Sequence, residues 1–450
     1  DSLYQWHWQT ARLLKATGNT EGALAAYQRA VTILTPIRYE YSVGYQGRHH
    51  SFQYSVAPLF TELEDVLLRQ AAMSTDTEET QRLLVRVRDV VETSRIAELQ
   101  DYYRDDCVAT ARANRGGSNS TPKGTAVIYP IMLPDRLELL VQTSEGLQRV
   151  AVPIGADQVT REARVFRRLV QDRRSNNYLQ SAQRMHSWLL APLQTDFSSR
   201  SIQTLVFVPD GPLRTIPMAA LHDGQRFAIE QYFVAVTPSM ELTDTQSADL
   251  SNTSLLSLGL TESVQGFPAL PNVATEVSTL KTLYGGRLLL DNQFIVPTLE
   301  QEIKGKDVSI VHIASHGQWE QEASKSFLLA YDDKISMNRL SQLVGLLEYR
   351  LAPLELITLS ACETAVGDDR AALGLAGVAV KAGARSALAT LWFVDDKATS
   401  ELVAEFYRLL RTQSITKAEA LQKAQLMIKQ GPGHEHPSFW APFLLISNWM

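Results

Sequence analysis

The sequence predicts an α/β protein in which a helical N-terminal arm precedes two lobes, each built on a parallel β-sheet. Its 450 residues exceed the roughly 250–300 that one hydrophobic core supports, so we expect at least two domains. Residues 1–112 carry helical patterns throughout. After residue 124, short β-branched runs alternate with helical segments, which is typical of a parallel sheet covered by helices on both faces.

The composition is that of an ordinary globular protein. Hydrophobic residues make up 45% and charged residues 20%, which excludes a disordered or fibrous chain. The formal net charge is -6 and the chain has no basic blocks, so nucleic acid is not expected as the main partner. The longest apolar runs, such as residues 378–380, fall far short of the roughly 20 residues that a membrane span needs.

Cysteine content and the start of the chain bear on the compartment. Two cysteines, Cys107 and Cys362, are too few for a disulfide framework, so we expect a reducing compartment and a cytoplasmic location. Because the chain begins at Asp1 rather than at methionine, we expect that an upstream segment has been removed. A cleaved signal peptide and a deleted domain would leave the same start.

The arm begins with two helices, residues 4–16 and 21–34, the second ending before Pro36. Ala23, Tyr27 and Ala30 recur at helical spacing and form one apolar face. This helix–turn–helix of about 34 residues resembles one tetratricopeptide (TPR) repeat. Because such repeats bury their faces only by stacking, the resemblance implies further repeats before Asp1, and a generic helical bundle is the alternative.

Two further predicted helices, residues 52–73 and 77–107, complete the arm over residues 1–112. Gly, Ser and Pro dominate residues 113–124, which predict a linker. Residues 125–250 form the first lobe and residues 251–450 the second.

In the first lobe, the pattern predicts strands at 126–131, 137–142, 205–208 and 233–237 and helices at 160–170 and 179–190. The first lobe has no paired His and Cys at its strand ends, so we interpret it as non-catalytic. In the second lobe, strands are predicted at 255–258, 287–290, 308–313, 354–359 and 386–391, and helices at 273–284, 298–304, 373–382 and 397–410.

Candidate catalytic residues follow two strands of the second lobe. His316 comes just after strand 308–313, and Cys362 just after strand 354–359. Ligands of α/β sheets bind beyond the carboxyl ends of the strands, and a Cys with a His about 50 residues upstream has the spacing found in caspases. An imidazole near the thiol would raise its thiolate fraction. Gly317 allows a tight turn and a backbone N–H that could face an oxyanion.

With this pair, a series of short motifs resembles the CHAT family of caspase-like cysteine peptidases, which often follow TPR repeats. The matching motifs, in chain order, are VPDGPL at 208–213, IPMAAL at 216–221, PS at 238–239, LP at 270–271, TE at 275–276, HIASHG at 312–317, LSACET at 359–364, GARS at 383–386, LW at 391–392, VDD at 394–396 and WAPF at 440–443. The resemblance covers residues 125–450. It implies a caspase-like fold for the catalytic lobe, with a related non-catalytic lobe before it.

The resemblance also implies roles for individual residues. His316 and Cys362 match the catalytic dyad, and the backbone N–H groups of Gly317 and Cys362 would hold the oxyanion. No cofactor is implied, and no calcium loop is recognisable. After Gly367 the family usually carries a Gly- and Glu-rich loop, whereas this chain has Asp368 followed by Asp-Arg-Ala, so the substrate-side loop departs from the pattern.

Plainer interpretations stand beside these. Cys362 could be an inert buried thiol, and Cys107 is expected to be structural. A zinc site from His312, His316 and Cys362 is conceivable but lacks a fourth ligand.

Specificity depends on acidic residues near the expected site. Asp395 and Asp396 could cap the next helix, or could supply negative charge to a pocket beside Trp392, with Asp368 in the loop after the nucleophile. The pocket hypothesis predicts cleavage after Arg or Lys, because a desolvated carboxylate pairs well with a guanidinium. Caspase-like relatives that cut after basic residues imply the same preference.

Taken together, the sequence predicts a cysteine endopeptidase that cleaves a protein substrate, with the TPR arm binding substrate or a regulatory protein. The alternative from another class is a non-cutting TPR scaffold or sensor whose caspase-like lobes serve as an interaction module.

Overall fold

The computed structural model describes residues 2–44, 52–103, 108, 121–247, 250, 253–305, 308–348, 354–364 and 368–450. Cys107 and most of the predicted linker lie outside the described residues. No helix within the described part of the chain combines the length and apolar character needed to cross a membrane.

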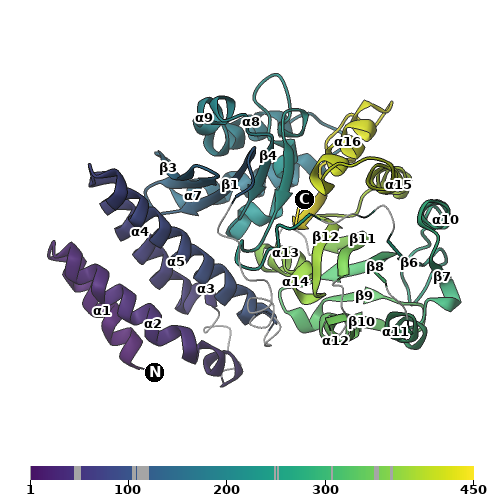
Figure 1. The fold of residues 1–450 in the computed structure, drawn as a ribbon, viewed down its shortest axis with the longest axis horizontal. Helices are drawn as coiled ribbons and strands as arrows, with labels where there is room; N and C mark the ends of the chain where they lie inside the picture. Colours follow the sequence, from purple (N-terminus) through teal and green to yellow (C-terminus); the bar gives the residue numbers. More distant parts are fainter. Residues whose placement is uncertain are drawn as a thin grey trace.

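The N-terminal region is helical, as the sequence predicts (Figure 1). Its helices are α1 (Ser2–Ala16), α2 (Thr20–Gly44), α3 (Phe52–Ser55), α4 (Ala57–Met73) and α5 (Thr77–Tyr103). The face predicted from the helical spacing is in the core, since Ala11, Ala23, Tyr27 and Ala30 are all fully buried. The prediction that the second helix ends before Pro36 is wrong, because α2 continues to Gly44. A proline inside a helix removes one backbone hydrogen bond, and here the chain on both sides stays helical.

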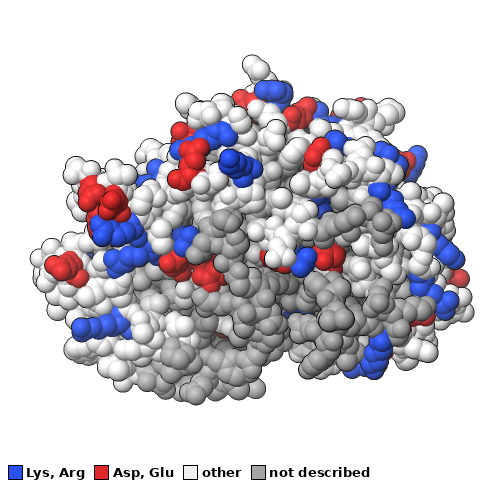
Figure 2. Space-filling model, in the orientation of Figure 1, with Lys and Arg blue, Asp and Glu red and all other residues white. Residues whose placement is uncertain are grey.

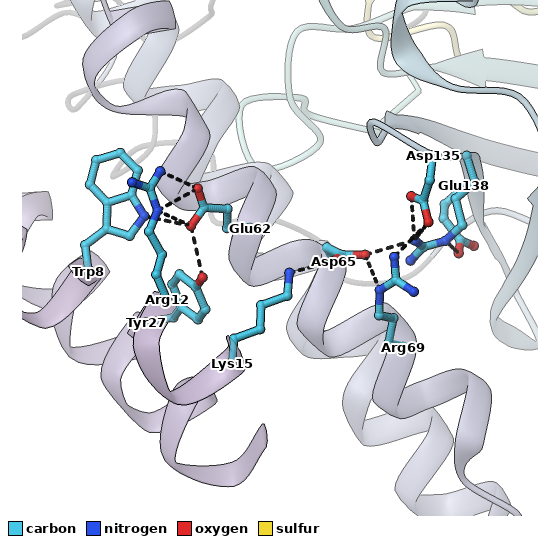
Figure 3. Close-up of polar contacts among 10 residues, drawn as sticks. Trp8, Arg12, Lys15, Tyr27, Glu62, Asp65, Arg69, Asp135 and Glu138 are labelled. Carbon is cyan, nitrogen blue, oxygen red and sulfur yellow. Dashed lines mark hydrogen bonds and ion pairs between the residues drawn. The ribbon is translucent and has the colours of Figure 1, made fainter. Parts of the chain in front are cut away.

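Helix α4 joins the first two helices to the β-sheet through two carboxylates (Figure 3). Glu62 accepts hydrogen bonds from Trp8 Nε1 at 2.8 Å and Tyr27 OH at 2.9 Å, and it pairs with Arg12 at 2.6 Å. Asp65 pairs with Lys15 of α1 at 2.8 Å and, toward the sheet, with Arg136 at 2.9 Å. The arm is therefore fastened to the sheet by charge-assisted contacts as well as by apolar packing.

Helix α5 packs directly against the first half of the sheet. Its Glu92 is buried and accepts hydrogen bonds from Tyr129 OH at 2.8 Å, from the Met240 backbone N–H at 3.0 Å, and from Ser239 Oγ. A buried carboxylate is stable only when several donors satisfy it. Glu92 therefore fixes α5 to the turn that contains the Pro-Ser motif at 238–239.

Residues 121–250 form the first half of the α/β region. The strands are β1 (Thr125–Met132), β2 (Leu137–Thr143), β3 (Gly146–Val152), β4 (Thr204–Phe207) and β5 (Phe233–Val236). The helices are α7 (Ala156–Gln171), α8 (Tyr178–Leu189) and α9 (Gln194–Ser199), with short 3-10 turns η2 (Ala191–Leu193), η3 (Gly211–Thr215), η4 (Met218–Ala220) and η5 (Ala228–Glu230). The predicted strands and helices are present here, and β3 is an additional strand.

The second half contains more elements than the sequence predicted. Its strands are β6 (Leu255–Gly259), β7 (Arg287–Leu290), β8 (Ile310–Trp319), β9 (Phe327–Leu329), β10 (Lys334–Ser336), β11 (Leu354–Thr364), β12 (Ala384–Thr390) and β13 (Phe443–Ser447). The helices are α10 (Val273–Tyr284), α11 (Val296–Gly305), α12 (Met337–Glu348), α13 (Asp369–Ala376), α14 (Val378–Lys381), α15 (Asp396–Thr412) and α16 (Lys417–Gln430), with the 3-10 turns η6 (Asp291–Gln293) and η7 (Ala323–Lys325). β9, β10, β13, α12 and α16 were not predicted.

The described strands form one thirteen-stranded sheet in the order β10-β9-β8-β11-β12-β13-β5-β4-β1-β2-β3, with β6 and β7 branching from β8. Central pairs such as β8 with β11 and β4 with β5 are parallel. In Figure 1, α10, α15 and α16 lie above the strands of the second half, and α11 and α12 lie below them. The predicted α/β fold class with a helical N-terminal region is confirmed.

The sheets of the two halves meet through the C-terminal strand. β13 runs antiparallel to β12 and pairs with β5 at Ile446 and Val236. The C-terminal strand β13 thus lies between β12 of the second predicted lobe and β5 of the first, and it connects them in one sheet. Their boundary at residue 250 stays a prediction.

Candidate active site

Strands β8 and β11 carry the two predicted catalytic residues, and these strands are neighbours in the sheet. They run parallel, and their register pairs Ala361 with His316 and Cys362 with Gly317. The backbone positions of the His and the Cys are therefore adjacent across one strand pair.

The prediction that both residues lie just past their strands is wrong, because the two strands are longer than expected. β8 continues to Trp319 and β11 to Thr364. The register shifts between Leu359 and Ala361, opposite Ile313 and His316. Such an irregularity re-aims the chain beyond it. The first part of β8 pairs with β6, and beyond the shift Gly317 and the following residue pair with β9 instead.

The His316 side chain is held by a backbone carbonyl. Its Nε2 lies 2.8 Å from the oxygen of Pro268, and its ring packs against Phe267 with centroids 5.1 Å apart. A carbonyl oxygen only accepts hydrogen bonds, so Nε2 carries the proton of the neutral ring. Nδ1 is then the nitrogen with a free lone pair, which is the state that a general base requires.

For Cys362 the structure describes the backbone alone, and residues 365–367, with Gly367, lie outside the described residues. Gly317 lies in the middle of three strands, paired with Leu328 of β9 on one side and with Cys362 on the other. The two backbone N–H groups predicted to hold an oxyanion thus belong to neighbouring positions of one sheet.

Trp392, predicted to line a substrate pocket, is packed against the first half of the protein. It is 5% exposed, and the guanidinium of Arg167 from α7 lies 4.4 Å from the centre of its ring. Arg167 also donates hydrogen bonds to the backbone oxygens of Thr215 at 2.8 Å and Leu391 at 2.7 Å. Burial lowers the pKa of Arg167 to about 9. The cation–π contact fixes the indole at the junction of the two halves.

The three aspartates predicted for the same pocket are engaged in local contacts. Asp395 is the N-cap of α15 and Asp368 the N-cap of α13, each accepting two backbone N–H groups from the first turn of its helix. Asp396 accepts hydrogen bonds from the backbone and side chain of Asn272 at 2.8 and 2.9 Å. Asn272 immediately precedes α10, so this carboxylate links α15 to the helix beside it.

His312, considered above as a metal ligand, has a different partner. It is fully buried, with Nε2 2.8 Å from a carboxylate oxygen of Glu276 on α10. The ring of Tyr407 meets it edge-on at 5.7 Å. Among the residues with described placement, no three His, Cys, Asp or Glu side chains are grouped as metal ligands. The signal for Glu276 was the Thr-Glu motif at 275–276, but its role as the partner of His312 was not predicted.

The end of α5 also reaches the candidate site, which was not predicted from the sequence. Tyr102 OH donates to the Glu320 backbone oxygen at 2.9 Å, directly after β8. Tyr103 OH donates to the Gly374 oxygen at 2.8 Å, and Asp101 pairs with Arg370 of α13 at 2.8 Å. A Cβ at Gly374 would lie 2.3 Å from Tyr102 OH, which explains the glycine at this position. The arm therefore contacts the segments that follow both His316 and Cys362.

A mostly parallel sheet with a His and a Cys at adjacent positions on neighbouring strands is a caspase-like arrangement. Residues 179–448 match the CHAT domain family, and because this match covers more than half of the chain, the protein belongs to that family. No curated protein matches the chain in sequence.

Solved structures show the likeness of the fold. The chain is similar to separase in the Saccharomyces cerevisiae separase–securin complex at 2.6 Å resolution, with a TM-score of 0.55 and 8% identity over 95% of this chain and 37% of that one. A second structure of the complex, at 3.0 Å, gives the same TM-score and coverage with 10% identity. This protein thus matches little more than a third of the separase chain, and the likeness is one of fold.

Proposed function

We propose that the protein is a cysteine endopeptidase that cleaves a protein substrate with a dyad of His316 and Cys362. The observation that carries the proposal is the register of β8 and β11, which pairs Ala361 with His316 and Cys362 with Gly317. The backbone positions of His316 and Cys362 are therefore one residue apart in register on neighbouring strands. The hydrogen bond from His316 Nε2 to Pro268 supports the proposal, because it leaves Nδ1 as the base.

In the proposed reaction, His316 Nδ1 accepts the thiol proton as the Cys362 sulfur attacks the scissile carbonyl carbon. The backbone N–H groups of Gly317 and Cys362 stabilise the oxyanion of the tetrahedral intermediate. The imidazolium then gives its proton to the leaving amine, and the C–N bond breaks to leave a thioester. A water molecule, deprotonated by His316, attacks the thioester and releases the acid and the free thiol.

A thiol-directed peptide probe tests the nucleophile. We expect the intact protein to be labelled at Cys362 in preference to Cys107, because only a thiol with a nearby base has a raised thiolate fraction at neutral pH. Mass spectrometry of the labelled peptides measures the ratio, and His316→Ala should lower labelling of Cys362 alone. Equal labelling of both cysteines, or none, would favour the non-cutting scaffold instead.

Specificity for Arg or Lys on the acyl side of the cut is a further part of the proposal. Trp392 and the carboxylates of Asp368, Asp395 and Asp396 are its basis. The contacts of Asp395 and Asp396 described above each use one carboxylate oxygen, whereas Asp368 uses both, since its second oxygen accepts a hydrogen bond from Gln321 at 2.6 Å. We expect a peptide library to be enriched in Arg or Lys at the cleaved position. Loss of one partner of a desolvated charge pair costs about 2–5 kcal/mol, so the responsible carboxylate should lower kcat/KM at least about thirtyfold when neutralised.

Asp396→Asn and Asp395→Asn, measured separately, would identify that carboxylate. Asparagine is chosen because it caps a helix about as well as aspartate. Asp395→Asn therefore removes the negative charge and keeps the cap of α15. Enrichment of Asp or of small apolar residues at the cleaved position would contradict the specificity proposal and leave the dyad untouched.

A protein partner for the helical arm completes the proposal. We propose that α1 to α5 act as a TPR-like arm that binds substrate or a regulatory protein in the cytoplasm. In the structures with the similar fold, separase is in complex with the protein securin. Figure 2 shows acidic and basic side chains intermixed over the visible face, which suits protein recognition better than binding to a polyanion.

A further inference from the structure

A polar cavity of about 250 Å³ lies where the arm meets the α/β region. Its wall comes from α3, α4, α5, α7, η3 and the first residue of α13. The charged residues that line it are Glu64, Arg95, Glu98, Arg164, Asp210 and Asp369. Asp210 and Gly211 belong to the VPDGPL motif at 208–213. Gly211 has a φ of 45°, a left-handed conformation that glycine adopts readily.

The two buried guanidiniums around this cavity are already paired. Arg95 lies 2.9 Å from Asp210. Arg214, directly behind the wall, forms two hydrogen bonds with Glu98 at 3.0 and 2.5 Å and contacts Asp210 at 3.2 Å. These arginines hold the pKa of Asp210 below its ordinary value. Asp210 and Glu98 are thus satisfied, and the remaining carboxylates of the wall are Glu64 and Asp369.

Glu64 makes neither a hydrogen bond nor an ion pair with any residue in the described part of the chain. It is 5% exposed, and burial raises the pKa of its carboxyl to about 7, opposed by Arg95 and reinforced by Asp210. Asp369 Oδ1 is buried and has no hydrogen-bond partner among the residues that the structure describes, and burial raises the pKa of Asp369 to about 6. Its nearest cation, Arg164, is 3.8 Å away with a side chain 61% exposed. Buried carboxylates ordinarily have charged or hydrogen-bonded partners.

We propose that this cavity is a binding site for a small organic cation, whose guanidinium or ammonium group pairs with Glu64 and Asp369. Four carboxylates face three guanidiniums here, so an added cation completes the charge balance. The volume admits an alkyl guanidinium or amine. The same group could be carried by a free amine or by an Arg or Lys side chain of a peptide. Because Asp369 opens α13, seven residues after Cys362, occupancy would stabilise the helix that follows the nucleophile.

Agmatine, which carries both a guanidinium and an amine, is the probe for the free-amine source. We expect isothermal titration calorimetry at pH 8 to give saturable binding with one site on the full chain. Glu64→Gln should weaken binding at least about tenfold, because glutamine keeps the shape and removes the charge. Since burial disfavours the charged form of Glu64, the variant should fold at least as stably as the parent at pH 8. Glu78→Gln, at an exposed position of α5, is the matched control and should bind as the parent does.

The pH dependence gives a second readout. Binding should weaken as the pH falls from 8 to 5.5, because protonation of Glu64 and Asp369 removes the charges that attract the ligand. The other charged groups facing them are Arg95 and Glu98 from α5, Arg164 from α7, Asp210 and Arg214 from the segment around η3, and Asp368 at the start of α13. Arg95 and Arg214 hold the pKa of Asp210 below its ordinary value, so the pH dependence is expected to come from Glu64 and Asp369.

A short peptide, Gly-Arg-Gly amide, tests the side-chain source with the same variants. Binding of either probe that Glu64→Gln weakens and Glu78→Gln does not would support the site. Binding by neither probe, or equal binding to both variants, would overturn it. Because the readout is binding alone, the outcome does not depend on whether the protein is a peptidase.

Discussion

Replacing Cys362 with alanine is expected to lower the rate of peptide cleavage by at least about a thousandfold. The thiol is the proposed nucleophile, and alanine cannot form the thioester. Cysteine and alanine are both small, and free cysteine behaves as a small hydrophobe, so the substitution should leave the fold intact. The measurement is kcat/KM on the peptide that the library selects, with circular dichroism to check folding.

Cys107→Ala is the matched control, since it removes the other thiol, and it should keep the parental rate. His316→Ala should cost nearly as much as Cys362→Ala, and the double variant little more than either, because the two residues act as a unit. A Cys362→Ala variant that retained cleavage would show that the dyad is assigned wrongly. The binding of agmatine in the arm cavity should be unchanged by this substitution.

Replacing Arg214 with methionine is expected to lower the free energy of unfolding by about 3–5 kcal/mol. Both sides of the Arg214–Glu98 pair are buried, with side chains 2% and 6% exposed. Without the guanidinium, the buried Glu98 would lose the partner of both its hydrogen bonds, and Asp210, which is 31% exposed, would keep Arg95 at 2.9 Å. Urea unfolding measures the loss through the shift of the midpoint at constant slope.

Arg408→Met is the control for this prediction. Arg408 pairs with Glu405 at 2.6 Å on the surface of α15, and a surface pair contributes about 0–1 kcal/mol. A second variant, Arg214→Met with Glu98→Leu, should recover part of the loss, because it removes the stranded charge together with its partner. A loss of less than about 1 kcal/mol in Arg214→Met would show that the Arg214–Glu98 pair does not stabilise the contact between α5 and the segment after the VPDGPL motif.

The sequence by itself determined the fold class and the identity of the candidate dyad. Alternation of β-branched runs with amphipathic segments marked the strands and helices of the parallel sheet, because a buried strand and a packed helix each impose their own period. His316 and Cys362 were identified as candidates because each was expected just after a predicted strand, and the motifs around them resemble those of the CHAT family. The strands, the helices and the motifs around the candidate residues could be predicted because each is encoded by a short, continuous stretch of sequence.

Only the tertiary structure decided the contacts between distant segments. β13 was not predicted because an apolar run of five residues does not by itself indicate a strand or the strands it pairs with. Its position between β12 and β5 depends on the packing of the whole sheet. The same holds for the bond between His316 and Pro268 and for the contacts of Tyr102 and Tyr103 with the segments around the site. Such contacts depend on which surfaces become complementary once the chain is packed.

The environment of the charged side chains was likewise decided by the tertiary structure, as Asp395 and the arm cavity show. The sequence allowed Asp395 to be either a helix cap or part of a pocket. The structure shows that it caps α15, and its part in a pocket stays a proposal. Glu64 was one glutamate among many in the sequence. Only packing against α5, α7 and η3 made it a buried carboxylate that has no partner among the described residues. Burial and pairing decide what a charged side chain can do, and both arise from contacts that the order of residues does not state.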